Sequence, residues 1–171
     1  VGPMLDCSSA TEAAGLNRWK LSCEGARWVS QVSVVAAYAG CPLRSPKARE
    51  VRIIEADAVT DWAELASPRF TVIIPDGADK AVDISKALLA AGRKADTPIT
   101  ITRGATTVEQ RTIASTLEEL PAAVKAAKQA GPGIVVVGEV LSNRDKLSWF
   151  ETKPLFGWRV LVPRTKEQAG A

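Results

Sequence analysis

The stretch FTVIIPDGADKAVDISKALLAAG, residues 70–92, decides the fold because it contains a strand, a break and a helix in succession. Residues 70–74 form a largely apolar run, typical of a strand buried on both faces. The following Pro-Asp-Gly interrupts the strand, since proline lacks a backbone donor and glycine frees the backbone. Residues 78–91 then carry apolar side chains at helical spacing, and Gly92 ends the helix.

The same alternation continues on both sides of this stretch. Strands are predicted at residues 51–55, 98–102, 111–115 and 134–137, and helices at residues 31–38, 61–65, 117–130 and 143–150. The strand at residues 111–115 is expected to run antiparallel to the strand before it. Buried strands that alternate with helices predict an α/β fold with a mixed, mostly parallel sheet flanked by helices.

The two ends of the chain differ in composition from its middle. Residues 1–28 contain no clear strand or helix. After a Lys-Pro pair, residues 158–162 read as a strand and residues 163–171 as the start of a helix. A lone strand and half a helix cannot bury a core, so we expect the chain to stop inside a second domain. The expected organisation is an unmatched segment at residues 1–28, a partial domain at residues 29–152 and the beginning of another at residues 153–171.

Composition excludes several classes of function. The chain has no histidine, which excludes Ser-His-Asp, Cys-His and histidine–metal sites, and no metal is expected. Its 22 basic and 19 acidic residues are too evenly spread to indicate nucleic-acid binding. No apolar run reaches the roughly 20 residues of a membrane span, and the start lacks the pattern of a secretory signal. Cys7, Cys23 and Cys41 form no metal or disulfide pattern, which predicts free thiols in the cytoplasm.

Small residues follow three of the predicted strands, in loops at residues 75–77, 103–106 and 138–139. Ligands of open α/β sheets bind at the carboxyl ends of strands, where small residues let the backbone approach closely. Plain turns are the alternative interpretation. The chain has neither a phosphate loop nor a dinucleotide fingerprint, and no carboxylates are paired for acid–base work. The residues indicate a ligand-binding edge without acid–base machinery.

The aromatic residues leave two interpretations open. Tyr38, the only tyrosine, precedes Gly-Cys-Pro and is either a packed phenol or part of a ligand loop. Trp149 and Phe150 are expected to bury area in the core or at a domain seam rather than to serve as a stacking platform.

Six short motifs occur in a characteristic order. They are AYAGCPL at residues 37–43, DWAELA at 61–66, TPITITR at 97–103, TVEQR at 107–111, GEV at 138–140 and KLSWF at 146–150. Together they resemble the uroporphyrinogen-III C-methyltransferases of the tetrapyrrole methylase family. The resemblance covers roughly residues 29–151 and implies the C-terminal half of a methylase domain. The stretch from Lys153 onward resembles the start of uroporphyrinogen-III synthase, as in methyltransferase–synthase fusions.

The resemblance implies S-adenosylmethionine as methyl donor and uroporphyrinogen III as acceptor, giving precorrin-2 on the branch to sirohaem and cobalamin. The sulfonium is already a good electrophile and the reduced pyrrole is electron-rich, so the protein contributes orientation and a dry site. The family's Gly-x-Gly-Pro-Gly-Asp and Gly-Gly-Asp-Pro loops do not occur here. We therefore expect this stretch to be inactive by itself. The resemblance also allows a homodimer.

Carried over residue by residue, the resemblance predicts a set of donor contacts. These are Ser30, Gln31, Asp76, Gly77, Thr100, Gly104 and Ala105. Asp76 replaces an apolar residue of the family and is expected to accept a hydrogen bond from a hydroxyl or amine of the donor. Tyr38 and Arg103 are the predicted substrate contacts, and no catalytic residue is predicted.

Two further functions remain open from the sequence. One is a non-catalytic ligand-binding or interaction module that has kept the α/β half-domain. The other is a methylase that acts on a later corrin intermediate, which the synthase-like end makes less favourable. If the chain is a uroporphyrinogen-III methyltransferase, its expected partner is the tetrapyrrole substrate. Neither nucleic acid nor a membrane is an expected partner.

Overall fold

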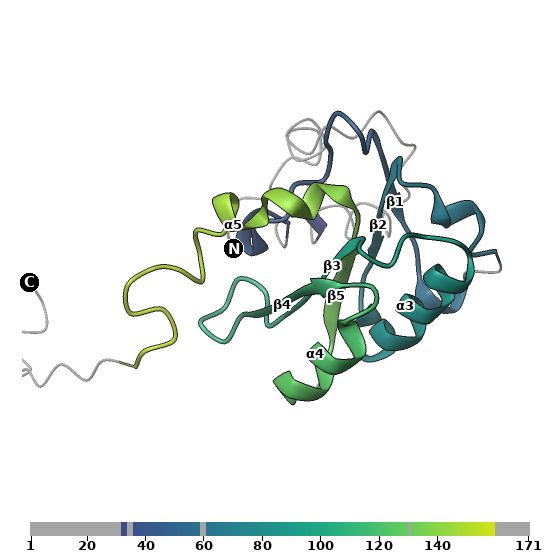
Figure 1. Cartoon of the computed structure of the whole chain (residues 1–171). Helices are drawn as coiled ribbons and strands as arrows, with labels where there is room; N and C mark the ends of the chain where they lie inside the picture. The colour runs from purple at the N-terminus through teal and green to yellow at the C-terminus, as the bar shows by residue number, and fades with distance from the viewer. Residues whose placement is uncertain (1–31, 34–35, 59–60, 130, 160–171) are drawn as a thin grey trace, which may run out of the picture.

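A computed structural model describes residues 32–33, 36–58, 61–129 and 131–159 (Figure 1). These residues form a five-stranded sheet in the order β1-β2-β5-β3-β4. The strands are β1 (Glu50–Ile53), β2 (Phe70–Ile74), β3 (Pro98–Arg103), β4 (Arg111–Thr116) and β5 (Gly133–Val137). The expected α/β fold and mixed sheet are confirmed.

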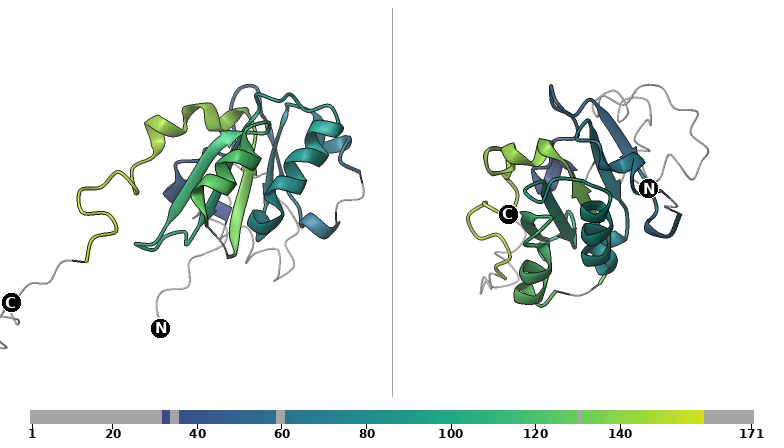
Figure 2. Two further views of the ribbon diagram at one scale, coloured as in Figure 1. Left: turned by 60° about the horizontal axis from the view of Figure 1, so that its bottom comes forward. Right: turned by 45° about the vertical axis from the view of Figure 1, so that its right-hand side comes forward.

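The sheet is covered on both faces. Helices α3 (Ala81–Ala90) and α4 (Leu120–Ala127) pack on one face, and Figure 2 shows both on the same side of the sheet. The other face is covered by helical residues 36–39 and by the turn η4 (Glu139–Asn143), which leads into α5 (Arg144–Leu147). Two apolar cores result, one on each face of a single sheet.

Burial on both faces explains the apolar strands. All five residues of β2 are buried, with Val72 and Ile74 in the core under α3 and α4 and Ile73 in the opposite core. Neighbouring side chains of a strand point to opposite faces, so only a strand covered twice needs apolar residues throughout. In β3 the pattern differs, because Thr100 and Thr102 alternate with the apolar residues of the α3–α4 core and are nevertheless buried.

The sheet is not mostly parallel, and that part of the prediction is wrong. Only β1 and β2 pair in parallel, while β5 runs antiparallel to both β2 and β3, and β4 runs antiparallel to β3. Each helix does join two strands of the same direction, since α3 lies between β2 and β3 and α4 between β4 and β5. Each such connection passes over one strand of the opposite direction, which local alternation does not reveal.

Most predicted elements are present with shifted ends. The residue 70–74 strand is confirmed, as are the antiparallel strand at β4 and the end of α3 before Gly92, whose φ is +92°. The helix predicted at residues 117–130 is shorter, because α4 starts only at Leu120, with a proline in its first turn. The predicted helix at residues 61–65 is the single 3₁₀ turn Glu64–Ala66.

Predictions for the two ends lie largely outside the described residues. Of the strand predicted at residues 158–162, only Trp158 and Arg159 are described, and neither is in a strand. Within the described ranges, no helix is both long and apolar enough to cross a membrane.

Candidate functional site at the carboxyl edge of the sheet

Two of the predicted ligand loops meet at one edge of the sheet. Strands β2 and β3 run in the same direction, so the loops after Ile74 and Arg103 leave the sheet at the same edge. Strand β5 begins there, because its first residue Gly133 pairs with Arg103. We call these three loops, residues 75–80, 104–110 and 131–132, the carboxyl edge.

Arg103 joins the three loops of the carboxyl edge. Its Nη2 donates a hydrogen bond to Asp79 Oδ1 at 2.9 Å, and its Nε donates to the Gly131 carbonyl oxygen at 2.9 Å. The Arg103 side chain is 8% exposed, against 65% for Asp79. A charged side chain buried to this degree requires such partners. Two nitrogens of the guanidinium are therefore engaged within the protein, while Nη1 is buried without a hydrogen-bond partner among the described residues. A substrate contact at Arg103 stays a prediction.

The loop after β2 is shaped for close approach by a ligand. Asp76 has a left-handed backbone (φ 53°) and is exposed, so its carboxylate is available to an incoming group. Gly77 is buried, and a Cβ at this position would lie 2.6 Å from Ile74 Cγ2. A larger residue at position 77 would displace the loop from the strand, which explains the glycine.

The loop after β3 is a compact turn. The Thr107 hydroxyl and backbone N–H both donate to the Gly104 carbonyl, at 2.7 and 3.1 Å, and Gly104 has a φ of 56°. Ala105 packs against the core opposite α3 and α4. Gly77 and Gly104, both predicted donor contacts, thus stand in two loops at the same edge of the sheet.

The third predicted loop is elsewhere. Gly138 follows β5, which runs in the opposite direction, and its N–H donates to the carbonyl of Pro98, the first residue of β3. A shared ligand edge for all three loops was the expectation, and it is wrong for residues 138–139. The direction of β5 is the reason.

Thr100 and the two residues before position 32 stand apart. Thr100 is 1% exposed, and its hydroxyl lies 3.5 Å from Cys41 Sγ in the middle of the sheet. A donor contact at Thr100 would require Cys41 to move, so it stays a prediction. Ser30 and Gln31 lie outside the described residues.

Tyr38 is part of an aromatic cluster beside the carboxyl edge. Its ring lies 4.7 Å from Phe150 and 5.3 Å from Trp149, measured between centroids, and Phe150 contacts Phe156 in turn. Edge-to-face geometry of this kind is favourable between aromatic rings. Trp149 is 46% exposed, so the cluster lies partly at the surface rather than in a closed core, and the domain seam stays a prediction.

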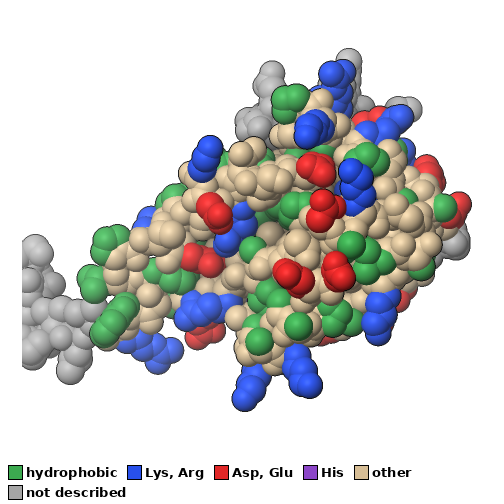
Figure 3. All heavy atoms as spheres, viewed as in Figure 1, with side chains coloured by type: hydrophobic (Ala, Val, Ile, Leu, Met, Phe, Trp, Pro, Cys, Tyr) green, Lys and Arg blue, Asp and Glu red, His purple; other side chains and the backbone are tan. Residues whose placement is uncertain are grey.

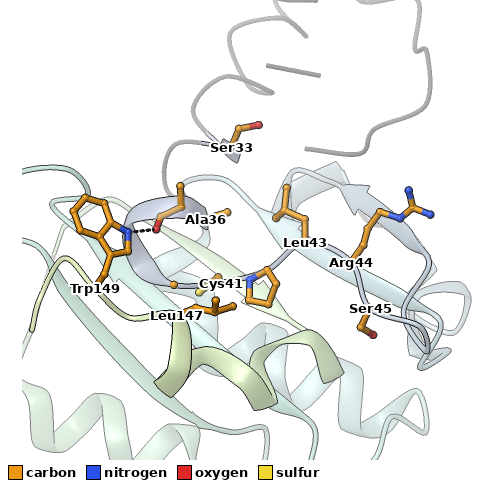
Figure 4. A pocket seen from close by; sticks show the side chains of 11 residues that line it. Ser33, Ala36, Cys41, Leu43, Arg44, Ser45, Leu147 and Trp149 are labelled. Carbon is orange, nitrogen blue, oxygen red and sulfur yellow. Dashed lines mark hydrogen bonds between the residues drawn. The ribbon is translucent and has the colours of Figure 1, made fainter. Parts of the chain in front are cut away.

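An open groove of about 800 Å³ is lined by residues 33, 36–37 and 40–45 together with Leu147 and Trp149 (Figure 4). Trp149 lies at one end, where its indole N–H donates to the Ala37 carbonyl at 3.0 Å, and Arg44 lies at the other. Gly40 also lines the groove, and a Cβ at this position would lie 2.7 Å from the backbone nitrogen of Ser148. None of the predicted donor contacts among the described residues lines this groove.

A buried polar network was missed by sequence analysis. Gln110 is 0% exposed, and its side chain bonds to Thr106, Tyr38 and Glu151. The motif at residues 107–111 contains this glutamine, but nothing local distinguishes a buried glutamine from an exposed one. Its partner Glu151 follows the Trp-Phe pair and is distant in sequence.

The Cys41 thiol is buried against β3. Burial raises the pKa of Cys41 above its ordinary value near 9.0, and the Thr100 hydrogen bond opposes this only partly. The thiol is therefore neutral at physiological pH, and an inert packed cysteine is the reading that its surroundings support.

The surface carries mixed charges. On the face shown in Figure 3, Lys and Arg side chains are interspersed with Asp and Glu. Among the described residues, no group of three or more Cys, Asp or Glu side chains is arranged to hold a metal ion.

The chain belongs to the tetrapyrrole methylase family, because the family model for Tetrapyrrole (Corrin/Porphyrin) Methylases matches residues 26–121, more than half of the chain. The siroheme synthase of Azotobacter vinelandii is 40% identical over 129 residues, covering 72% of this chain and 28% of the relative. The siroheme synthase of Chromobacterium violaceum is 34% identical over 145 residues, covering 81% of this chain and 31% of the relative.

Solved structures agree on the fold. The uroporphyrin-III C-methyl transferase of Thermus thermophilus, complexed with S-adenyl homocysteine, matches with a TM-score of 0.51 and 24% identity over 63% of this chain and 50% of that chain. A cobalt precorrin-4 methyltransferase matches with a TM-score of 0.55 and 20% identity over 65% and 49%. The chain thus spans about half the length of these structures and less than a third of the curated relatives.

The hydrogen bonds that Arg103 makes to Asp79 and Gly131 predict that replacing Arg103 destabilises the protein more than replacing Asp79. Arg103→Ala removes the buried guanidinium together with its two hydrogen bonds and should destabilise the protein by about 2–3 kcal/mol. Asp79→Ala should cost only about 1 kcal/mol, because Asp79 is mostly exposed. Urea denaturation of both variants and of the double variant would measure the coupling. Asp83→Ala is the control, since Asp83 is exposed and should change stability by less than about 0.5 kcal/mol. A coupling energy of zero between Arg103 and Asp79 would contradict the stabilising role of their hydrogen bond.

Cys41 predicts slow labelling and a loss of stability at high pH. The folded protein holds the thiol proton more tightly than the unfolded chain, so the stabilising contribution is complete below pH 9 and declines as pH rises further. Iodoacetamide labelling at pH 8, followed by peptide mass spectrometry, should leave Cys41 unmodified until urea is added. Rapid labelling of Cys41 in the folded protein would show that the thiol is accessible.

Proposed function

We propose that this chain is the C-terminal part of an S-adenosylmethionine-dependent methyltransferase that methylates carbon atoms of uroporphyrinogen III, giving precorrin-2. Family membership and the siroheme synthase relatives support the tetrapyrrole pathway. The observation that carries the proposal is the carboxyl edge, where two close-packed turns, at Gly77 and Gly104, follow strands that end at the same edge of the sheet. Such turns let a flat, polar donor lie against peptide groups.

The residues of the edge fit a methyl donor. When bound, the donor supplies a sulfonium methyl group to the electron-rich pyrrole carbon. Asp76 is exposed at the edge and would accept a hydrogen bond from the donor's hydroxyl or amine, while Gly77, Gly104 and Ala105, which have small or no side chains, would leave room for the donor. Arg103 acts as a positioning residue that holds the loops.

The aromatic cluster is the part of the described surface suited to the tetrapyrrole. Tyr38 and Trp149 present apolar rings next to cationic groups, with Lys153 Nζ 4.3 Å from the Trp149 ring centroid. Apolar rings suit the macrocycle, and cations suit the carboxylates at its rim. Substrate would then lie between the carboxyl edge and this cluster.

We further propose that these 171 residues do not complete the site by themselves. Asp76, Gly104, Thr106 and Thr107 are exposed, so no second wall closes over the carboxyl edge within the described residues. The rest of the site comes from the remainder of a longer cytoplasmic protein, in which the methylase runs into a uroporphyrinogen-III synthase from residue 153. A homodimer of that protein is compatible with the proposal.

A second candidate is a non-catalytic module that binds a ligand or partner in the groove between Trp149 and Arg44 (Figure 4). The groove's size favours this alternative, and apart from Trp149 its lining shares no residue with the site proposed above. It differs from the first proposal in the location of the ligand.

A chimeric enzyme tests the methyltransferase proposal. Residues 29–152 would replace the matching stretch of the Azotobacter vinelandii relative, and methyl transfer from S-adenosylmethionine to uroporphyrinogen III would be followed. We expect the chimera to methylate, and Asp76→Gly in the chimera to raise the KM for the donor while tolerating the left-handed backbone. Asp83→Ala serves as the matched surface control.

The 171-residue chain itself provides the complementary result. We expect calorimetry to detect no micromolar complex with S-adenosylmethionine and the assay to detect no methylation. A micromolar complex would contradict the incomplete site, and a folded chimera without activity would contradict the methyltransferase proposal.

A further inference from the structure

Gln110, the last residue of the loop after β3, has the most completely enclosed polar side chain of the carboxyl edge, and it is neither a proposed donor contact nor a proposed substrate contact. It stands immediately before β4 and is 0% exposed. Its Oε1 accepts the Thr106 backbone N–H at 2.9 Å. Its Nε2 donates to the Tyr38 carbonyl at 3.1 Å and to Glu151 Oε1 at 2.8 Å. One side chain therefore bonds to three segments that are far apart in the sequence.

Glu151 brings the C-terminal segment into this network. Besides Gln110, its Oε1 accepts a hydrogen bond from the Thr112 hydroxyl of β4. Its Oε2 lies 3.7 Å from Arg144 Nη2, and Arg144 Nε donates to the Ala39 carbonyl at 3.1 Å. The Arg144 and Glu151 side chains are 13% and 20% exposed. A partly enclosed carboxylate with three partners stabilises one arrangement of the segments around it.

The aromatic cluster is attached to the same segment. Trp149 and Phe150 precede Glu151 directly, and both rings pack on Tyr38, whose carbonyl is the second acceptor for Gln110. On the far side, Phe156 lies against Phe150 and under the Arg111 guanidinium, 5.7 Å from its carbon. When residues 148–156 are in place, Gln110 is enclosed and its acceptors are fixed.

The loop at residues 104–109 depends on Gln110 at its middle. Thr107 ties the start of this loop to Gly104 and its end to the Glu109 N–H, while Thr106 has a left-handed backbone (φ 71°) and bonds to Gln110. A non-glycine residue in this conformation is held there by its surroundings. The loop contains Gly104 and Ala105, two of the proposed donor contacts, so its conformation determines where these two residues lie.

We propose that Gln110 and Glu151 are positioning residues that couple the docking of residues 148–156 to the conformation of the edge loop at residues 104–109. With the segment docked, Glu151 orients the Gln110 amide, and the amide oxygen holds Thr106 in its left-handed conformation. With the segment displaced, the Gln110 amide loses an acceptor and the loop is released. The effect on donor binding rests on the proposed methyltransferase function, whereas the coupling itself does not.

The coupling predicts that a change at Glu151 is felt at Thr106. Backbone amide exchange would be followed by NMR in the 171-residue chain. Glu151→Ala should speed exchange at the Thr106 amide by about three- to tenfold, the effect of losing one hydrogen bond. The conservative Glu151→Gln keeps an oxygen that accepts from Gln110 and Thr112, and should stay within about twofold of the parent chain at Thr106. Gln110→Ala should reproduce the Glu151→Ala result and also shift the Trp149 indole resonance.

Two controls separate coupling from general destabilisation. Thr152→Ala removes the hydrogen bond from Thr152 to the Ser148 carbonyl in the same segment and should leave Thr106 unchanged. The amides of Ile99 and Ile101 in the buried strand β3 report global opening and should not follow Thr106. Equal acceleration at β3 and Thr106, an equal effect of Thr152→Ala, or no effect of Glu151→Ala would each overturn the proposal. Coupling in an enzyme whose chimera is inactive would refute only the methyltransferase function.

Discussion

The antiparallel insertion of β5 between β2 and β3 is the constraint on which the rest of the molecule depends. Because β5 runs against both neighbours, β2 and β3 must run in the same direction and end at one edge. The start of β5 comes to that edge, which places the Gly131 carbonyl within reach of Arg103. The close packing at Gly133, where a Cβ would lie 2.6 Å from the Thr102 carbonyl oxygen, shows how tightly these strands approach.

The hydrogen bonds of two buried side chains, Arg103 and Gln110, then stabilise the loops of the carboxyl edge. Each side chain acts on a different loop. Arg103 joins the loop after β2 to the start of β5 through Asp79 and Gly131. Gln110 fixes the loop after β3 to Tyr38 and Glu151. Buried polar groups stabilise a single arrangement when every partner is present, and they penalise alternatives in which a partner is lost. The conformation of the proposed donor site is therefore stabilised by residues that are not themselves proposed donor contacts.

The sequence predicted the elements well because their signals are local. An apolar run at residues 70–74, helical spacing before Gly92 and β-branched residues in β5 each determine the structure of their own segment. Strand order is a different matter, since nothing in residues 133–137 shows that they insert between two strands of the opposite direction. The wrong expectation for the loop at residues 138–139 has the same cause, because the direction of β5 could not be predicted.

The candidate site was predictable only in part for a similar reason. Glycines after strands and the family resemblance pointed to Gly77 and Gly104, which the structure brings to one edge. The contacts of Arg103 within the protein could not be predicted, because its partners Asp79 and Gly131 lie 24 and 28 residues away in the sequence. No role was predicted for Gln110 or Glu151, since the importance of a buried amide depends on contacts that only the folded chain brings together.

The most direct test of this account is to locate where a product of the methyl donor binds. A ¹⁵N-labelled sample of the chain would be titrated with millimolar S-adenosylhomocysteine, and chemical-shift changes would be assigned to residues. We predict weak binding with changes concentrated at the amides of Gly77, Gly104 and Ala105. Changes concentrated along the groove at residues 40–45, with the carboxyl edge unaffected, would contradict the account.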